Sequence, residues 1–251
     1  MISIASGYET VAFFGLAGAF EVLERFRPAR EIDRWRHVKT DVFSFALAIL
    51  MNRVSQYSIK RFVQASAPPS MLGGWLALQR LPASARIFLA IVLADFVIYW
   101  IHRAQHEFGP MWRTHQWHHS TEQLYWFSGF RTSFLHTFMY NIPQAAIPIL
   151  IFNLSPLELG IAYSMALLIQ FWEHTNFDVA IGPLQFLVIT PAYHRVHHSV
   201  QHNRRNFGTT FSLWDRMFGT YLNPAMVAVD APLGLGEPYG ATKTARMLAG
   251  F

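Results

Sequence analysis

Long apolar stretches separated by short polar breaks dominate this chain and predict helices. Most approach the roughly 20 residues that a helix needs to cross the hydrocarbon core of a bilayer. The second contains Asn52 and Arg53, so it is more amphipathic than a lipid-facing span and could lie partly against protein or at the interface. Only residues 153–156 separate the last two, which predicts a hairpin. The stretches run over about Tyr8 to Leu23, Asp41 to Ile59, Ile87 to Ile101, Phe134 to Phe152 and Leu157 to Trp172.

The composition fits a chain that is largely solvated by lipid. Hydrophobic residues make up 52% of the 251 positions and charged residues 14%, which is more apolar than is usual for a soluble domain. The first stretch has no signal-peptide cleavage pattern, so we expect it to remain as an anchor. No linker or repeat divides the sequence. We predict an all-α integral membrane helical bundle of about 4–5 spans, forming one domain over 1–251, with N-terminal anchor spans over about 8–60 and a tail at 222–251.

Basic residues gather beside apolar segments rather than in an exposed groove. The net charge is +5, and six cations lie between residues 25 and 39. This pattern is typical of a cytoplasmic loop or of a contact with anionic lipid, and it does not favour nucleic acid as a partner. If this loop is cytoplasmic, counting the spans along the chain brings every histidine group to the same side. We therefore predict an integral membrane protein with a cytoplasmic helical cap formed by residues 102–133 and 175–251.

Eight of the twelve histidines fall into three tight groups: H-R-A-Q-H, H-Q-W-H-H and H-R-V-H-H. On a helix, residues three and four apart share a face, so we expect each group to aim its imidazoles at one point. Pro110 before the second group, and Thr190 and Pro191 before the third, predict short helices there. Eight convergent imidazoles are more than one ion uses, so we predict a dinuclear site with the ligands His102, His106, His115, His118, His119, His194, His197 and His198.

The remaining candidates have weaker claims on this site. We expect His174, at the end of the hairpin, to be a ninth ligand, His202 and His136 to be possible ligands, and His37 to be solvated. Metal-bound histidine usually donates its second ring N–H to a carboxylate or carbonyl, and an acid within an apolar stretch needs a partner. The candidate acceptors are Asp95, Glu173 and Asp178, although a simple buried polar network would also explain Asp95. The chain has no cysteine, which excludes thiolate ligands and cysteine-bound iron–sulfur clusters.

The histidine groups, together with the segment N-F-G-T-T-F-S-L-W-D-R-M-F-G-T from Asn206 to Thr220, resemble the fatty acid hydroxylase/sterol desaturase superfamily. The resemblance covers about residues 85–221, which it identifies as the catalytic core. It implies a membrane di-iron enzyme that uses dioxygen and external electrons on a lipid C–H bond, with the eight motif histidines and His174 as ligands. Some fatty acid 2-hydroxylases have a further histidine four residues before His174. This chain has Gln170 there, so the ligand set is nine or includes the Gln170 amide.

We therefore predict an oxygen-dependent lipid hydroxylase with two iron ions, for which zinc is a possible substitute, and with dioxygen as co-substrate. The chain has no dinucleotide-binding fingerprint and no cysteine, so the expected partners are a membrane lipid and an external ferredoxin- or cytochrome-like electron-transfer protein. The lipid chain should enter between the helices. Its route could be lined by Trp126, Phe127, Phe130 and Phe134, which would equally suit an aromatic belt at the interface.

Three alternative functions remain. A lipid or sterol desaturase of the same superfamily would use the same ligands, so the ligands do not distinguish it. A zinc-dependent hydrolase is disfavoured because H-R-A-Q-H lacks the glutamate of H-E-x-x-H metalloproteases. A metal transporter should place polar groups near the bilayer midplane, whereas these histidines lie at the ends of the apolar stretches.

Overall fold

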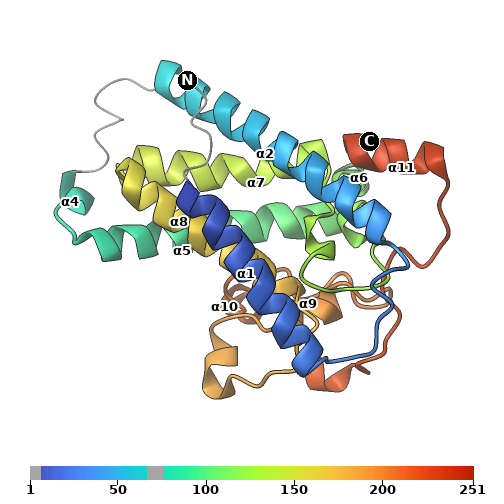
Figure 1. Ribbon diagram of the computed structural model, residues 1–251. Coiled ribbons are helices and arrows are strands. Elements are labelled where there is room, and N and C mark those ends of the chain that lie inside the picture. The colour runs from blue at the N-terminus through green and yellow to red at the C-terminus, as the bar shows by residue number, and fades with distance from the viewer. Residues whose placement is uncertain (1–6, 67–75) are drawn as a thin grey trace.

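The computed structural model describes residues 7–66 and 76–251, whose regular structure is helical (Figure 1). These residues form isolated β-bridges but no strand, which confirms the all-α class. The long helices coincide with the five apolar stretches: α1 (Gly7–Phe26), α2 (Val38–Ser66), α5 (Ala83–Glu107), α7 (Phe134–Ala146), which the π-helical turn η3 (Ile147–Ile151) extends, and α8 (Pro156–His174).

The predicted hairpin is present as α7, η3 and α8, with α5 packed against both helices. Its return helix begins with a capping box. The Ser155 hydroxyl accepts a hydrogen bond from the Glu158 backbone N–H, and the Glu158 carboxylate accepts one from the Ser155 N–H at 2.7 Å. Pro156 occupies the first helical turn, where a missing N–H costs nothing. This local chemistry explains why the chain reverses at residues 152–155.

Several polar residues of the second apolar stretch bond to α7. α2 packs along α7, and the Asn141 amide of α7 donates a hydrogen bond to Asn52 at 2.8 Å. Gln56 donates to the same Asn141 side chain at 3.0 Å. Arg53, by contrast, is exposed. The amphipathic character of α2 therefore comes from a polar seam with α7.

By length and hydropathy, one helix of the described residues, α5 over Ala83–Glu107, could cross a membrane. The predicted count of about 4–5 spans thus stays a prediction. Large apolar side chains are nevertheless exposed on the other long helices as well. They include Phe14 on α1 (67% exposed), Phe62 on α2 (70%), Ile142 on α7 and Leu157 on α8 (76%).

Short helices gather around one end of the bundle (Figure 1). A buried ion pair ties α2 to this region, and a buried hydrogen bond ties α1 to it. Arg131 donates to Asp41 at 2.6 Å with both side chains 1% exposed, and Glu24 of α1 accepts from the Asn176 N–H at 2.7 Å. The short elements are α4 (Leu76–Gln79), near the opposite end, and α6 (Gly109–His115), η1 (His118–Ser120), η2 (Ser128–Phe130), η4 (Gly182–Phe186), α9 (Pro191–His197), α10 (Leu213–Met217), η5 (Pro224–Met226) and α11 (Ala241–Ala249).

Part of the positive charge in the 25–39 loop is neutralised inside the protein. Arg34 pairs with Glu21 at 2.9 Å and with Glu24 at 2.8 Å, and Arg30 donates to the Ala231 carbonyl at 3.2 Å. The loop therefore has a structural role in addition to any role in setting orientation.

Candidate metal centre

The last two turns of α5 and three short elements carry the motif histidines. His102 and His106 lie at the end of α5, and His115 ends α6. The predicted helix start in the third group is confirmed, since the Thr190 hydroxyl accepts from the Tyr193 N–H at 3.1 Å and Pro191 opens α9. In the second group α6 ends at His115, and His118 and His119 lie in a 3-10 turn.

Nine buried histidines form two clusters, in each of which the candidate ligand atoms lie within 4.8 Å of one another. The eight motif histidines and His174 are all included. One cluster, here called the five-histidine cluster, contains His102, His106, His115, His119 and His197. The other, the four-histidine cluster, contains His118, His174, His194 and His198. Two clusters of this size fit the predicted pair of metal ions.

The expectation that each motif aims at one point is met by His102 and His106 but is wrong for the other two groups. In both H-x-x-H-H groups the histidines four apart share a cluster, whereas the middle histidine joins the other cluster. Consecutive residues diverge by about 100° in an α-helix and by about 120° in a 3-10 turn, so adjacent histidines such as His118 and His119 cannot serve the same ion easily. The double histidine therefore links the two clusters.

The spacing of the ring nitrogens matches coordination geometry. In the five-histidine cluster, the Nε2 atoms of His102 and His115 are 3.0 Å apart, and those of His119 and His197 are 3.1 Å apart. In the four-histidine cluster, the Nε2 of His174 lies 3.2 Å from that of His118 and 3.1 Å from that of His194. Ligands about 2.1 Å from one ion at right angles would lie about 3.0 Å apart.

Backbone carbonyls fix which nitrogen of several rings faces the cluster. The Nδ1–H of His102 donates to Phe207 O at 2.7 Å, that of His118 to Arg131 O at 3.0 Å, that of His174 to Gln170 O at 2.9 Å and that of His197 to Arg205 O at 2.8 Å. A carbonyl can only accept, so Nδ1 carries the proton and Nε2 offers its lone pair. The donor set therefore fits a metal.

Burial keeps these imidazoles neutral. Removal from water lowers the pKa of His118 to about 4, although its bond to the Arg131 carbonyl acts in the opposite direction. Burial also holds the pKa of His194 and that of His197 well below the ordinary value. Neutral imidazole is the form that binds a metal, so the site needs no deprotonation near pH 7.

The three possible additional ligands lie outside both clusters. The Nδ1 of His136 is 3.0 Å from the Nδ1 of His115, on the side of that ring turned away from His102. The Gln170 side chain donates to the Gly129 carbonyl at 2.7 Å. His202 is half-buried in the turn after α9, and its backbone N–H donates to Ser199.

The three candidate carboxylates have different surroundings. Glu173 lies beside the four-histidine cluster, with its oxygens 3.5 Å from His174 Nδ1 and 3.8 Å from His194 Nδ1. Asp178 is exposed and lies 3.7 Å from Arg27, so the structure does not bring it to the site.

Asp95 does not accept a hydrogen bond from a histidine as predicted. The segment after Phe207 folds over α5, and its donors bond to both Asp95 oxygens. These accept from the Thr209 hydroxyl, the Thr210 and Phe211 N–H groups and the Trp214 indole at 2.7–3.2 Å. The alternative reading of Asp95, a buried polar network, describes these contacts.

Sequence reasoning missed Asp215 as a residue that positions the site. Its carboxylate accepts from the Phe207 and Gly208 N–H groups at 2.8 and 2.7 Å, from Thr220 Oγ1 at 2.6 Å and from the Tyr193 hydroxyl. The Phe207 carbonyl in turn accepts the hydrogen bond from the His102 Nδ1–H. Asp215 belongs to the L-W-D-R-M-F-G-T segment, which contributed to the family resemblance. The segment's sequence does not indicate which groups the Asp215 carboxylate contacts.

Sequence reasoning also missed Gly129, which gives His174 its place. A Cβ at this position would lie 2.4 Å from the His174 Cγ, closer than any carbon contact allows. Glycine is therefore required for the His174 ring to reach the cluster.

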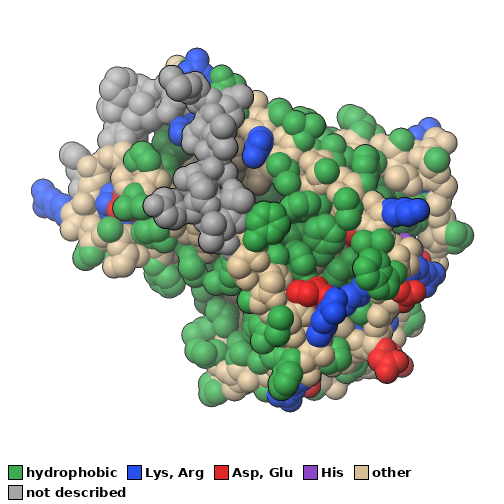
Figure 2. Space-filling view, in the orientation of Figure 1, with side chains coloured by type: hydrophobic (Ala, Val, Ile, Leu, Met, Phe, Trp, Pro, Cys, Tyr) green, Lys and Arg blue, Asp and Glu red, His purple; other side chains and the backbone are tan. Residues whose placement is uncertain are grey.

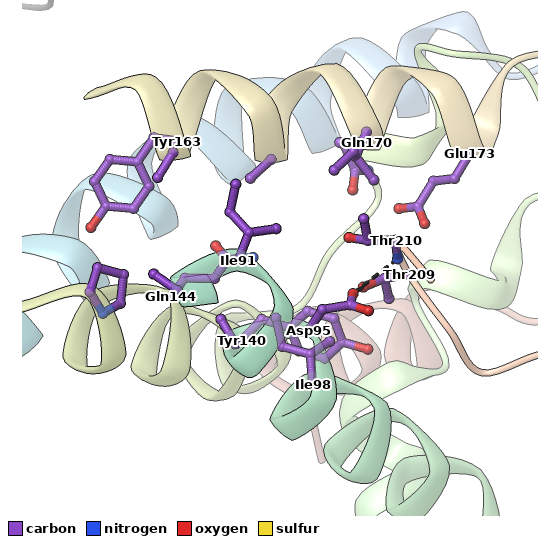
Figure 3. Close-up of a pocket in the computed structure, with 16 residues that line it drawn as sticks. Ile91, Asp95, Ile98, Tyr140, Gln144, Tyr163, Gln170, Glu173, Thr209 and Thr210 are labelled. Carbon is purple, nitrogen blue, oxygen red and sulfur yellow. Dashed lines mark hydrogen bonds between the residues drawn. The ribbon is translucent and has the colours of Figure 1, made fainter. Parts of the chain in front are cut away.

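A cavity lies between α5, α7 and α8 (Figure 3), and Glu173, one of the residues that line it, is the neighbour of His174 described above. Its volume is about 100 Å³. Small apolar residues line its length, and Glu173 and Tyr140 lie toward one end. The Tyr140 ring is 4.1 Å from the His136 ring and 6.2 Å from the His102 ring. Tyr140 Oη and Glu173 Oε2 are buried and have no hydrogen-bond partner among the described residues.

The aromatic residues expected along a lipid route are not part of this cavity. The Trp126 ring packs on Phe171 at 5.0 Å, and Phe130 contacts Phe13 and Phe45 of the first two helices. Phe127 also packs on Phe45, and Phe134 is 40% exposed at the start of α7. Phe127 and Phe130 therefore join the first two helices to the cap, and Trp126 joins α8 to it.

A helical protein with two adjacent clusters of buried, neutral histidines is a candidate dinuclear metalloprotein. The chain belongs to the fatty acid hydroxylase family, whose model matches residues 87–220. It is 34% identical over 160 residues to an alkylglycerol monooxygenase of Xenopus tropicalis, which covers 61% of this chain and 34% of that protein.

Two further relatives have similar identity. An alkylglycerol monooxygenase of Danio rerio is 33% identical over 208 residues, covering 81% of this chain and 45% of the relative. The ornithine lipid hydroxylase OlsE of Rhizobium tropici is 33% identical over 146 residues, covering 57% and 44%. The chain thus spans less than half the length of these relatives. No solved structure matches it.

Proposed function

We propose that this protein is an oxygen-dependent lipid hydroxylase in which nine histidines hold two iron ions, with zinc as a possible substitute. One observation carries the proposal. The cavity between α5, α7 and α8 is lined by Glu173, which lies 3.5 Å from His174 of the four-histidine cluster, so a lipid chain placed there would bring a C–H bond toward the candidate metal pair. The family supports oxygen chemistry at such a site, and the two hydroxylase relatives support a lipid substrate.

Hydroxylation of a C–H bond by dioxygen consumes two electrons and two protons and releases one water. Iron, when bound, would supply the activation of dioxygen. The nine histidines would hold it with neutral nitrogens and leave its positive charge uncompensated. The apolar cavity wall would exclude water and orient the chain, and Tyr140 and Glu173 could hold a polar group of the substrate beside the reacting carbon. The electrons would come from a ferredoxin- or cytochrome-like protein.

The relatives' names indicate the kind of substrate. Alkylglycerols and ornithine lipids are both amphiphiles with a compact polar head and a long alkyl or acyl chain. We propose a membrane lipid of this build, with its chain in the cavity and its head group toward the cap.

We further propose that the whole chain is one integral membrane unit of about 4–5 spans with a catalytic core over about residues 85–221 and a cytoplasmic metal site. Exposed apolar side chains on the long helices support contact with lipid (Figure 2). Cysteines introduced singly at positions 154 and 200 test the orientation, since the chain has no native cysteine. Labelling of both positions from the same side would refute the hairpin crossing.

The test of the activity is a comparison of lipids from cells with and without the gene, grown under ¹⁸O₂. A hydroxylase leaves one labelled oxygen in the product. A desaturase product instead loses two hydrogens, and oxygen derived from water would indicate the zinc hydrolase. The control is His118→Ala, which should restore the lipid profile of cells without the gene. A product that still forms in this variant would contradict the proposal.

A further inference from the structure

Trp112 brings the protein surface into direct contact with the five-histidine cluster. Its ring centroid lies 4.9 Å from that of His106 and 5.3 Å from that of His119. The side chain is only half-buried. The five-histidine cluster is therefore separated from solvent on this side by one aromatic ring, whereas the histidines themselves are buried.

A second contact reaches the same cluster from the turn after α9. His197 donates its Nδ1–H to the Arg205 carbonyl at 2.8 Å, while the Arg205 side chain is exposed and donates to the Gly219 carbonyl at 3.2 Å. The neighbouring Arg204 is also exposed.

Exposed apolar and positively charged residues accompany both contacts in sequence, since Phe108 and Arg113 lie close to Trp112 and Arg204 precedes Arg205. We define the Trp112 surface as Phe108, Trp112, Arg113, Arg204 and Arg205. Phe108 is 59% exposed, and the Phe108 carbonyl accepts from the Trp112 N–H at 2.8 Å. The nearby acid Glu107 is neutralised by Arg103 at 2.8 Å, and Arg246 of α11 lines a concavity with Arg113, which extends the positive charge.

We propose that the Trp112 surface is the docking site for an acidic electron-transfer protein. This inference rests on the proposed function, which requires electrons from outside the chain. An electron transfer partner needs a short path, an apolar contact and charge complementarity for fast, weak encounter, and its interface is typically below about 1,200 Å². Each docked donor gives up one electron and leaves oxidised, so two encounters supply the two electrons that one hydroxylation consumes.

The test uses the full chain in nanodiscs of zwitterionic lipid and an acidic [2Fe–2S] ferredoxin as the probe. The variant is Arg113→Glu with Arg204→Glu. The matched control is Arg27→Glu with Lys39→Glu, which changes two exposed cations, one directly after α1 and one in the first turn of α2. We expect the Trp112-surface variant to bind ferredoxin more than tenfold more weakly and with less dependence on salt. The ferredoxin affinity of the control variant should stay within twofold of that of the unmodified protein.

Turnover with two reductants separates this inference from the proposed function. The variant should lose ferredoxin-supported product formation and keep the rate obtained with reduced methyl viologen, a small reductant that needs no docking site. Equal ferredoxin binding in all three proteins would overturn the inference, as would a variant whose affinity falls only for vesicles of anionic phosphatidylglycerol. The inference would also be overturned if the unmodified protein bound neither the ferredoxin nor an acidic cytochrome b5. No product with viologen in the iron-loaded, unmodified protein would count against the proposed function, whatever the binding result.

Discussion

Replacing Asp215 by asparagine tests whether a carboxylate away from the clusters holds the five-histidine cluster in place. The carboxylate is fully buried and accepts hydrogen bonds on both oxygens. Oδ1 receives the Phe207 N–H and the Thr220 hydroxyl, and Oδ2 receives the Gly208 N–H and the Tyr193 hydroxyl. Asparagine has nearly the same shape but only one acceptor oxygen.

The cost can be worked out from these contacts. If the amide oxygen takes the place of Oδ1, the amide nitrogen faces the Gly208 N–H, and at least one hydrogen bond to a charged group is lost. Such a bond contributes about 1.5–3 kcal/mol, and the stranded N–H adds desolvation cost, so Asp215→Asn should destabilise the fold by about 2–3 kcal/mol. Tyr193 can rotate its hydroxyl to accept instead. For a chain of this length the melting temperature should fall by about 4 to 12 °C.

The same change should weaken metal binding. A shift of Phe207 releases its carbonyl from the His102 Nδ1–H, 2.7 Å away, and loss of such a partner typically lowers metal affinity by about 10- to 100-fold. Thermal unfolding in detergent and metal content by mass spectrometry measure the two effects. Asp230→Asn, at an exposed acid, is the control. An Asp215→Asn protein with unchanged melting temperature and metal content would refute the reasoning.

Three other outcomes are expected. His118→Ala or His197→Ala should abolish activity and lower bound metal, each in its own cluster, while His37→Ala should be nearly silent; activity retained in both would make the clusters structural. The metal-free protein should lose stability as pH falls below about 6.5. The histidines of the unfolded chain bind protons in this range, whereas the buried imidazoles of the folded protein stay neutral. For His118, with a folded pKa of about 4, the loss is on the order of 3 kcal/mol by pH 4, and chemical denaturation at several pH values checks it. Ala166→Phe, in the cavity wall, should raise KM for long-chain lipid without changing metal content, and an unchanged KM would exclude the cavity as the substrate site.

The long helices and the candidate ligands could be predicted because each depends on a pattern of residues that lie close together in the sequence. Apolar stretches predict helices, and histidine at spacings of three and four is rare without a metal. The polar residue Asn52, which weakened the second stretch as a lipid-facing span, is explained by a contact with Asn141. A pairing across 89 positions of sequence leaves no local signal, so the amphipathic pattern alone left two readings open.

The division of the histidines between clusters could not be predicted from spacing alone. Adjacent histidines point in different directions both in the 3-10 turn of His118 and His119 and at the end of α9, but the packing of these elements determines which cluster each histidine joins. The partner of Asp95 was unpredictable for a related reason. The donors come from a loop more than a hundred residues away, and single-sequence patterns do not indicate which loop covers which helix.

That loop connects the two halves of the proposed site. Its Phe207 carbonyl holds His102 of the five-histidine cluster, while Thr209 and Thr210, two and three residues later, line the metal end of the cavity. Asp215 fixes the first part from within the cap, and Asp95 fixes the second part from α5. Because one short segment is held by two buried carboxylates, the position of the candidate metals and the shape of the cavity end cannot vary independently. A substitution that moves this segment should therefore change metal affinity and the position at which a lipid is oxidised together.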